Sequence, residues 1–285
     1  MAKKIVRSVT RFGMARKNAI QFFKYKKGYE RCLIILGCQR SGTTLITHLF
    51  NQLRFSRVFG EFSVLSNIDE HKIRLNPLKE VISSLNAVHA PLVILKPLVE
   101  SHRAEELLNS IENSSIIWVY RNFKDAALSS SKKTKSLNGH GNILSIVENK
   151  QDDWRNEGVS PKLRELAKEL YLSQSLSALD AACLFWYIRN SLYFDQQLNK
   201  NQKVHIWKYE DFLGDPAQEI NGLLHQLNLQ CIDKNVNDVV YTTSVNQARD
   251  MNASKEILNL CEELESKLDA SRELYCKEAQ HKHNP

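Results

Sequence analysis

Short apolar runs alternate with longer amphipathic stretches along most of the chain. The apolar runs predict β-strands at residues 32–36, 58–59, 92–95, 116–120 and 204–207. The stretches between them have apolar residues at helical spacing and predict helices at residues 43–53, 79–88, 104–111, 124–135 and 175–198. The first run is apolar throughout, which indicates a strand buried on both faces.

This alternation predicts an α/β fold with three layers, in which helices flank a central parallel sheet in a P-loop-like arrangement. We find no internal repeat and no linker rich in Pro or Gly. We therefore expect a single α/β domain over residues 31–285, preceded by a basic amphipathic arm over residues 1–30. Ligands of such a sheet bind at the carboxyl ends of its strands.

The net charge of +7 is concentrated at the start of the chain. Residues 1–31 contain ten basic side chains and one acidic side chain, a local charge of +9 that leaves −2 for the rest. A nucleic-acid-binding surface needs basic residues spread over the folded body. We therefore predict no nucleic-acid partner and expect any anion pocket to be local.

The basic arm has an apolar side as well. Its apolar residues fall roughly on one side of a helix and are Ile5, Val9, Phe12, Ile20 and Phe23. Such a helix could make peripheral contact with an anionic membrane. Three other interpretations stay open: a solvated arm, an element docked on the body, and an organellar transit peptide. We expect no transmembrane helix, because no apolar run approaches the ~18 residues that span a bilayer.

The six cysteines are scattered and lack the spacing of a zinc site or a redox pair. We expect reduced thiols, which favours a reducing, cytoplasmic location. We also predict no metal requirement.

A glycine-containing turn follows the first buried strand and leads directly into a helix. Gly37 and Gly42 permit the tight turn, and the helix N-terminus directs backbone N–H groups at an anion. A Walker A loop would have Lys after its second glycine, whereas Thr43 stands here. The positive charge lies instead at Arg40, before that glycine, where it could reach a 5′-phosphosulfate. A purely structural turn is the alternative.

A second signature follows the strand at residues 116–120. Arg121 leaves the carboxyl end of this strand, and Ser129 follows eight residues later, about two helical turns away. An arginine fork and a serine hydroxyl together suit one phosphate group. An exposed arginine and an unrelated helix-surface serine are the alternative.

The two segments together resemble the sulfotransferase superfamily that uses 3′-phosphoadenosine 5′-phosphosulfate (PAPS). Residues 39–44 resemble its 5′-phosphosulfate loop, and residues 120–129 resemble its 3′-phosphate motif. Residues 207–216 resemble a later strand, acidic turn and helix of carbohydrate and bacterial members, which we interpret as architectural. The resemblance implies a sulfotransferase that moves a sulfuryl group from PAPS to an acceptor hydroxyl and releases 3′,5′-ADP. The donor-binding residues that it implies are Gln39, Arg40, Ser41, Gly42, Thr43, Thr44, Arg121 and Ser129.

The resemblance also implies catalytic roles. Arg40 would stabilise the leaving phosphate, and Glu61, which follows a short strand, is the leading candidate for the general base. Lys96, at the end of the strand at residues 92–95, would orient the acceptor or the sulfuryl group. A surface or helix-capping role is the alternative for Glu61. Weaker base candidates are His48, His89, His102 and His140.

The acceptor is a hydroxyl compound, and the family resemblance slightly favours a carbohydrate or glycolipid. Residues 129–142 suggest a mobile basic lid or acceptor-binding loop, with a solvated helix end as the alternative. Ser244 and Arg249 are further candidates for the nucleotide site. A P-loop kinase or other nucleotide-binding protein, and a noncatalytic module that binds a membrane or anionic partner, remain alternative functions.

Overall fold

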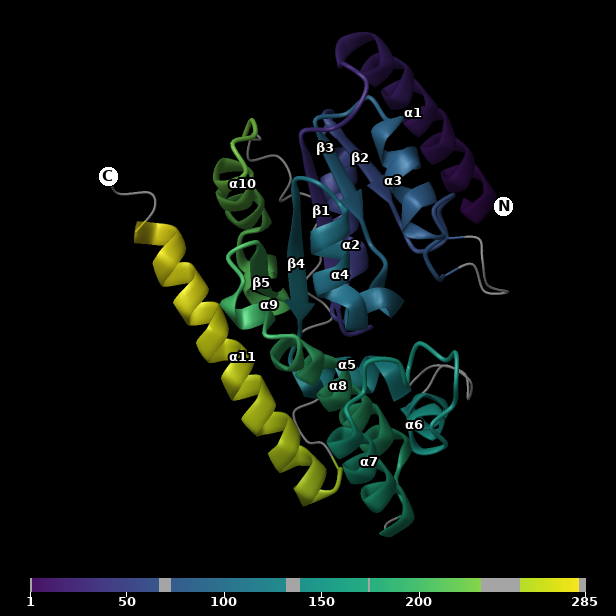
Figure 1. Ribbon diagram of the computed structural model, residues 1–285, viewed down its shortest axis with the longest axis vertical. Helices are drawn as coiled ribbons and strands as arrows, with labels where there is room; N and C mark the ends of the chain where they lie inside the picture. Colours follow the sequence, from purple (N-terminus) through teal and green to yellow (C-terminus); the bar gives the residue numbers. More distant parts are fainter. Residues whose placement is uncertain (1, 67–72, 132–138, 174, 232–251, 282–285) are drawn as a thin grey trace.

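The computed structural model describes residues 2–66, 73–131, 139–173, 175–231 and 252–281, and side chains within those ranges from residue 13 to residue 279 (Figure 1). Ser244 and Arg249, the two additional candidates for the nucleotide site, lie outside the described residues.

One parallel sheet forms the centre of the molecule, with the strand order β2-β3-β1-β4-β5 (Figure 1). Its strands are β1 (Arg31–Gly37), β2 (Ser56–Phe59), β3 (Leu92–Leu95), β4 (Ser114–Tyr120) and β5 (Val204–Lys208). The five predicted strands are confirmed, each within two residues at either end. All residues of β3 and β4 are buried, as the continuous apolar runs predicted.

Helices connect the strands and cover both faces of the sheet (Figure 1). They are α1 (Ala2–Lys24), α2 (Thr43–Gln52), α3 (Leu78–Asn86), α4 (Ala104–Ser110), α5 (Phe123–Ser131), α6 (Gly139–Val147), α7 (Pro161–Ser173), α8 (Ala178–Asp195), α9 (Tyr209–Gly214), α10 (Pro216–Gln226) and α11 (Lys255–His281). Short 3₁₀ helices are η1 (Leu98–Arg103) and η3 (Leu198–Lys200). Helices α2, α3, α4, α5 and α8 confirm the five predicted helices, with somewhat different ends.

Alternate residues of β1 enter two separate hydrophobic clusters, which explains the three layers. Leu33 and Ile35 pack with residues of α2, α9 and α10, whereas Ile34 and Leu36 pack with residues of α3, α4 and α8. A strand directs successive side chains to opposite faces, so an entirely apolar strand needs helices on both sides. The three-layer α/β fold with a parallel sheet is therefore confirmed.

Helix α8 is buried around most of its circumference and forms the centre of a helical layer with α5, α6 and α11. It begins with a capping box, in which the Ser177 hydroxyl accepts from the Asp180 N–H and the Asp180 carboxylate accepts from the Ser177 N–H. A helix that is buried on most sides needs packing partners around its circumference. This burial explains why the predicted helical segment at residues 175–198 is apolar over so much of its length.

The prediction of a loop over residues 129–142 is wrong at both ends. Residues 129–131 complete α5, and residues 139–142 begin α6, while residues 132–138 lie outside the described residues. Helix α6 forms because Ile143 and Ile146 are fully buried in the large hydrophobic cluster that includes α8. The two glycines at positions 139 and 141 favoured a loop in the sequence analysis, but packing against α8 stabilises a helix at these positions.

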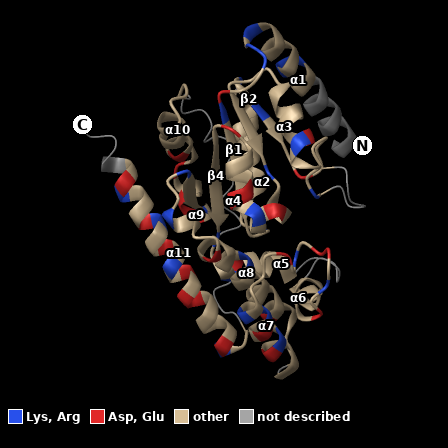
Figure 2. Cartoon of the chain, in the orientation of Figure 1, with Lys and Arg blue, Asp and Glu red and all other residues tan. Residues whose placement is uncertain are grey.

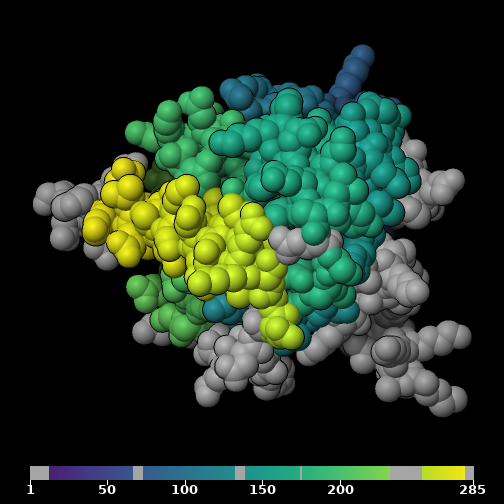
Figure 3. Space-filling view, turned by 90° about the horizontal axis from the view of Figure 1, so that it is seen from below, coloured from purple at the N-terminus to yellow at the C-terminus, as the bar shows by residue number. Residues whose placement is uncertain are grey.

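Helix α11 was not predicted, and it joins the helical layer to the edge of the sheet. It lies across the lower face of the molecule (Figure 3). Arg272 donates to the carbonyl of Ile206 in β5 at 3.0 Å, and Asp269 accepts a hydrogen bond from the Tyr120 hydroxyl at 2.7 Å. The helix therefore fixes the strand end from which Arg121 emerges.

Two further sequence expectations concern thiols and membrane spans. All six cysteines are free, and Cys32, Cys38, Cys183 and Cys261 are buried. Within the described part of the chain, no helix is both long and apolar enough to cross a bilayer.

Gly139 allows α6 to approach α8 closely, and this contact generates a test. A Cβ at this position would overlap the backbone nitrogen of Ala182. We expect Gly139→Ala to lower the free energy of unfolding by about 1–3 kcal/mol through overpacking. The matched control is Gly222→Ala in α10, where a Cβ meets nothing within 4 Å. The control should be neutral or stabilising by up to about 1 kcal/mol, since alanine favours helices.

Denaturant unfolding of both variants measures the difference. Equal stability of the two variants would contradict the close approach of α6 and α8.

Candidate active site

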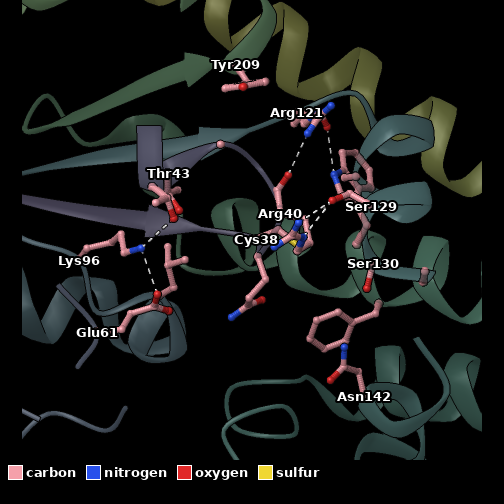
Figure 4. A pocket seen from close by; sticks show the side chains of 18 of the residues that line it. Cys38, Arg40, Thr43, Glu61, Lys96, Arg121, Ser129, Ser130, Asn142 and Tyr209 are labelled. Carbon is pink, nitrogen blue, oxygen red and sulfur yellow. Dashed lines mark hydrogen bonds and ion pairs between the residues drawn. The ribbon is translucent and has the colours of Figure 1, made fainter. Parts of the chain in front are cut away.

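A cavity of about 690 Å³ opens at the carboxyl ends of the strands (Figure 4). One side consists of the loop after β1, the start of α2 and the residues that directly follow β3 and β4. The other side consists of α5, α6, α8 and the turn at residues 154–155. The predicted site residues that line it are Gln39, Arg40, Gly42, Thr43, Thr44, Glu61, Lys96, Arg121 and Ser129. The structure thus brings nearly all of them together.

The loop between β1 and α2 needs glycine at two positions. Gly37 has φ +130°, and a Cβ there would overlap the Val119 carbonyl oxygen of β4. Gly42 has φ +81°, and a Cβ there would overlap the ring of Tyr209. Arg40 also has a positive φ, of 71°, an unusual conformation for a residue with a side chain. The loop is therefore held tightly between β4 and α9.

Helix α2 begins at this loop without a side-chain cap. Its first N–H groups and the positive end of its dipole face the region that Thr43 and Thr44 line. Nearby, the Gln39 amide and the Ser41 hydroxyl are buried and make no hydrogen bond within the described residues. Ser41 is fully buried and does not line the cavity itself. Gln39 does line the cavity, where a bound anion would supply acceptors for its amide N–H groups.

The two sequence signatures meet directly. The Arg40 guanidinium donates to the Ser129 hydroxyl through Nε at 3.0 Å and through Nη2 at 2.7 Å (Figure 4). Arg121 is buried and donates through Nη1 to the Arg40 carbonyl oxygen at 3.4 Å. Partial burial, and then the nearby charge of Arg121, lower the pKa of Arg40. Two guanidinium groups therefore share one cavity, where a bound anion would relieve their repulsion.

Arg121 is held in place from several directions. Its guanidinium lies 5.0 Å from the centre of the Tyr209 ring, 3.7 Å from an Asp125 oxygen and 3.9 Å from a Glu210 oxygen. Its carbonyl oxygen accepts a hydrogen bond from the Trp186 indole at 3.1 Å. Tyr209 and Glu210 belong to the segment at residues 207–216, which the sequence interpretation treated as architectural. That segment also contributes to the site, since Tyr209 lines the cavity.

Glu61 and Lys96 form an ion pair at the opposite end of the cavity from Arg121 (Figure 4). Lys96 Nζ lies 3.0 Å from Glu61 Oε2 and donates to the Thr44 hydroxyl at 3.2 Å. Glu61 follows β2 and Lys96 follows β3, and these strands are neighbours in the sheet. The pair therefore connects the base candidate to the start of α2.

The four histidines suggested as weaker base candidates do not line the cavity. His89 faces the Tyr25 carbonyl and the Phe22 ring, and His102 lies 3.0 Å from a Glu157 oxygen. His48 is exposed, and His140 lies on α6. Among the described residues, no group of three or more His, Cys, Asp or Glu side chains is arranged to hold a metal ion.

The helical side of the cavity contains residues that sequence reasoning missed. Trp154, Phe185 and Trp186 form an aromatic wall. Beside it, Arg155 lies over the Trp154 ring at 4.7 Å and donates to the Asn142 side-chain oxygen at 2.7 Å. Phe185 and Trp186 lie within a predicted apolar helix, so their pattern indicated burial without indicating a cavity.

An acidic group lies behind Arg121. Asn122 donates through its backbone N–H to Glu210 at 3.2 Å and through its amide to both Glu265 oxygens at 3.1 and 3.2 Å. Burial raises the pKa of Glu265 to about 7; Lys208 opposes this effect, and Asp269 adds to it. This carboxyl group on α11 therefore titrates near neutral pH.

The fold and the cavity together define an α/β protein of the P-loop-like class, with a cavity lined by two arginines at the carboxyl edge of its sheet. The chain belongs to the sulfotransferase family, because the family model described as Sulfotransferase domain matches residues 30–282. It is therefore a transferase enzyme of the sulfotransferase type. No curated protein sequence matches the chain.

Several solved structures are similar to this chain. They include a sulfotransferase from Alicyclobacillus acidocaldarius, with 15% identity over 85% of this chain and 94% of that chain and a TM-score of 0.48. The sulfotransferase domain of the Synechococcus PCC 7002 olefin synthase has 13% identity over 83% of this chain and 95% of that domain, with a TM-score of 0.44. Mouse sulfotransferase SULT7A1, complexed with PAP, has 13% identity over 81% of this chain and 70% of that chain, with a TM-score of 0.42.

The raised pKa of Glu265 generates a prediction about stability and pH. The folded state holds this proton more tightly than the unfolded chain, where the group titrates near 4.5. The contribution of Glu265 to the stability of the wild type should therefore fall as the pH rises from about 4.5 to 7 and then level off. Glu265→Gln cannot ionise, so it should be more stable than wild type at pH 8, on the order of 1–2 kcal/mol, and the difference should shrink toward pH 5.

Thermal unfolding between pH 5 and 8 measures this effect. Glu273→Gln, an exposed site on the same helix, serves as the control and should track wild type. A constant difference between Glu265→Gln and wild type across this range would rule out the assignment.

Proposed function

We propose that this sulfotransferase uses PAPS as its donor. The backbone N–H groups that open α2, together with Arg40, Thr43 and Thr44, hold the 5′-phosphosulfate. Arg121 and Ser129 hold the 3′-phosphate. The observation that carries this proposal is that the Arg40 and Arg121 side chains line one cavity. The Ser129 hydroxyl of the second motif accepts hydrogen bonds there from Arg40 of the first. Such a pair of arginines suits a donor with phosphate groups at both ends of its ribose.

A buried polar group of the loop supports the same assignment. The Gln39 amide lines the cavity and makes no hydrogen bond within the described residues. The uncapped α2 N-terminus and the absence of lysine at position 43 suit a phosphosulfate better than a magnesium-bound triphosphate. We propose no metal in the reaction. Family membership and this loop together disfavour a P-loop kinase.

We propose that Glu61 takes the proton from the acceptor hydroxyl, because Glu61 lines the cavity and its ion pair with Lys96 fixes its carboxylate there. The acceptor oxygen then forms a bond to sulfur while the bond from sulfur to the phosphate oxygen breaks. Arg40 stabilises the charge that develops on the leaving phosphate, and Lys96 orients the sulfuryl oxygens. Positioning and charge stabilisation supply most of the rate, as in phosphoryl transfer.

We also propose that the acceptor is a carbohydrate or a glycolipid. The aromatic wall of Trp154, Phe185 and Trp186 offers flat apolar faces against which a sugar ring can pack. Asn142 and Arg155 add planar polar groups beside this wall. Incubation with radiolabelled PAPS and separate pools of carbohydrates, glycolipids, phenols and peptides tests this class. Exclusive labelling of phenols or peptides would overturn it.

Nucleotide binding tests the donor proposal. Arg121→Ala should weaken binding of 3′,5′-ADP about 30-fold, which corresponds to about 2 kcal/mol of charge-assisted hydrogen bonds. Arg121→Lys keeps the charge but loses the fork, so it should fall between wild type and Arg121→Ala. Arg103→Ala is the control, because Arg103 pairs with Glu106 and does not line the cavity.

Isothermal calorimetry provides the affinities, and thermal shifts compare the ligands. We expect 3′,5′-ADP to stabilise the wild type and ATP with magnesium to leave it unchanged. The reverse order, or an unchanged affinity in Arg121→Ala, would refute the donor assignment.

Turnover tests the catalytic residues. Arg40→Ala and Glu61→Ala should each lower kcat by at least about 100-fold, since one loses charge stabilisation of the leaving group and the other loses the base. Both variants should still bind 3′,5′-ADP through Arg121 and the loop N–H groups. Glu80→Ala, at an exposed position on α3, is the control and should retain wild-type kcat. Wild-type kinetics in either site variant would remove that residue from the mechanism.

A further inference from the structure

Helix α1 is attached to the body by its polar side. Lys17 donates through Nζ to the Asn51 carbonyl at 2.7 Å, and Gln21 donates to the carbonyls of Arg54 and Ser56 at 2.9 and 2.8 Å. Gln21 is only 3% exposed. These contacts lie between the end of α2 and β2, at the edge of the sheet (Figure 1). An element that is docked by an amphipathic helix usually buries the apolar side of that helix, so this arrangement is inverted.

The apolar residues of α1 remain exposed as a consequence. Phe23 is 86% exposed and Ile20 is 53% exposed. Phe23 follows the buried Gln21 by two residues, which places it about 200° around the helix. Four of the nine large apolar residues that are exposed within the described part of the chain belong to this one helix. The exposure is therefore concentrated and calls for a partner.

The helical spacing of apolar residues extends toward the start of the sequence. Ile5 precedes Phe23 by 18 residues and Phe12 precedes it by 11 residues, close to whole numbers of helical turns. Their positions therefore share the side of the helix on which Phe23 stands. By helical spacing alone, the positions of the apolar residues noted in the sequence fall along one side of this segment.

Charge identifies the partner. Residues 1–31 carry a local charge of +9, and α1 itself has no acidic residue. Arg16 and Lys24 are exposed one turn before and one turn after Ile20. The coloured part of α1 in Figure 2 contains basic residues and no acidic residue. A second copy of the chain would bring two such segments together and repel. An anionic lipid surface offers phosphates for the cations and an acyl boundary for the apolar side chains.

We propose that the exposed side of α1, which we define as Arg16, Ala19, Ile20 and Phe23 with Lys24 on its flank, docks this protein on the surface of an anionic lipid bilayer. The helix lies in the plane of the interface, with Ile20 and Phe23 at the acyl boundary and the two cations at headgroup phosphates. Lys17 and Gln21 keep the polar side of α1 on the body, so this one helix would hold the domain at the membrane. This surface is separate from the cavity and does not depend on the donor or acceptor assignments.

Vesicle sedimentation of the full chain tests the apolar part of this surface. We expect wild type to sediment with phosphatidylglycerol vesicles at least about ten-fold more strongly than with phosphatidylcholine vesicles, and to lose this binding in high salt. The double variant Ile20→Ser and Phe23→Ser should lower the partition coefficient at least about ten-fold. The matched control is Leu172→Ser and Leu274→Ser, which removes two other exposed leucines and should leave binding within about two-fold.

A second pair of variants tests the cations. Arg16→Gln and Lys24→Gln should weaken sedimentation about ten-fold or more, because each basic side chain near an anionic surface contributes favourably. Lys162→Gln and Lys168→Gln on α7 lower the net charge equally and serve as the control. If both pairs weaken binding to the same extent, net charge alone is responsible and the assignment to α1 is overturned.

Direct insertion has its own readout. The indole introduced by Phe23→Trp should be quenched by brominated acyl chains in phosphatidylglycerol vesicles, whereas the indole introduced by Leu172→Trp should not. Unchanged sedimentation of the Ile20 and Phe23 variant overturns the proposal. The proposal is also overturned if sedimentation velocity shows a wild-type dimer that becomes monomeric in this variant. That result would assign the surface to contact with a second copy of the chain. Binding of 3′,5′-ADP in solution should be unaffected in every variant, so failure here is distinguishable from failure of the donor proposal.

Discussion

Two guanidinium groups from different strand ends share one cavity, and the rest of the site is arranged around that constraint. Arg40 follows β1 and Arg121 follows β4, and these two strands are hydrogen-bonded neighbours. Their closeness requires glycine at position 37, where β4 leaves no room for a side chain. Burying a cation is costly without compensation, and carboxylates and the Tyr209 ring surround Arg121 for this reason. The parallel sheet therefore brings two arginines that are 81 positions apart in the sequence into one cavity.

Sequence patterns identified the sheet and the loop well, because both depend on local signals. The runs at residues 32–36 and 116–120 are apolar on both faces and are followed by charged residues at the strand ends, so strand position and site position were predicted together. Glu61 and Lys96 were also placed correctly in the cavity, since each follows a predicted strand.

Long-range packing explains what sequence patterns missed. The expected loop over residues 129–142 ends with two glycines, yet residues 139–142 begin α6, because α8 supplies an apolar surface for this helix. Trp154 and Phe185 reach the cavity only because α6 and α8 pack together, and no short motif records that contact. An element docked on the body was one of the open interpretations of the basic arm, but no sequence pattern indicated that Lys17 and Gln21 make the contact.

The bond from the Trp186 indole to the Arg121 carbonyl oxygen joins the two halves of the cavity. Trp186 belongs to the aromatic wall, while Arg121 belongs to the anion-binding side. A change of the wall at this position therefore reaches the opposite side through one buried hydrogen bond. Trp154 and Phe185 belong to the same wall but take no part in this bond, so substitutions there can alter what the wall accepts and leave the bond to Arg121 in place.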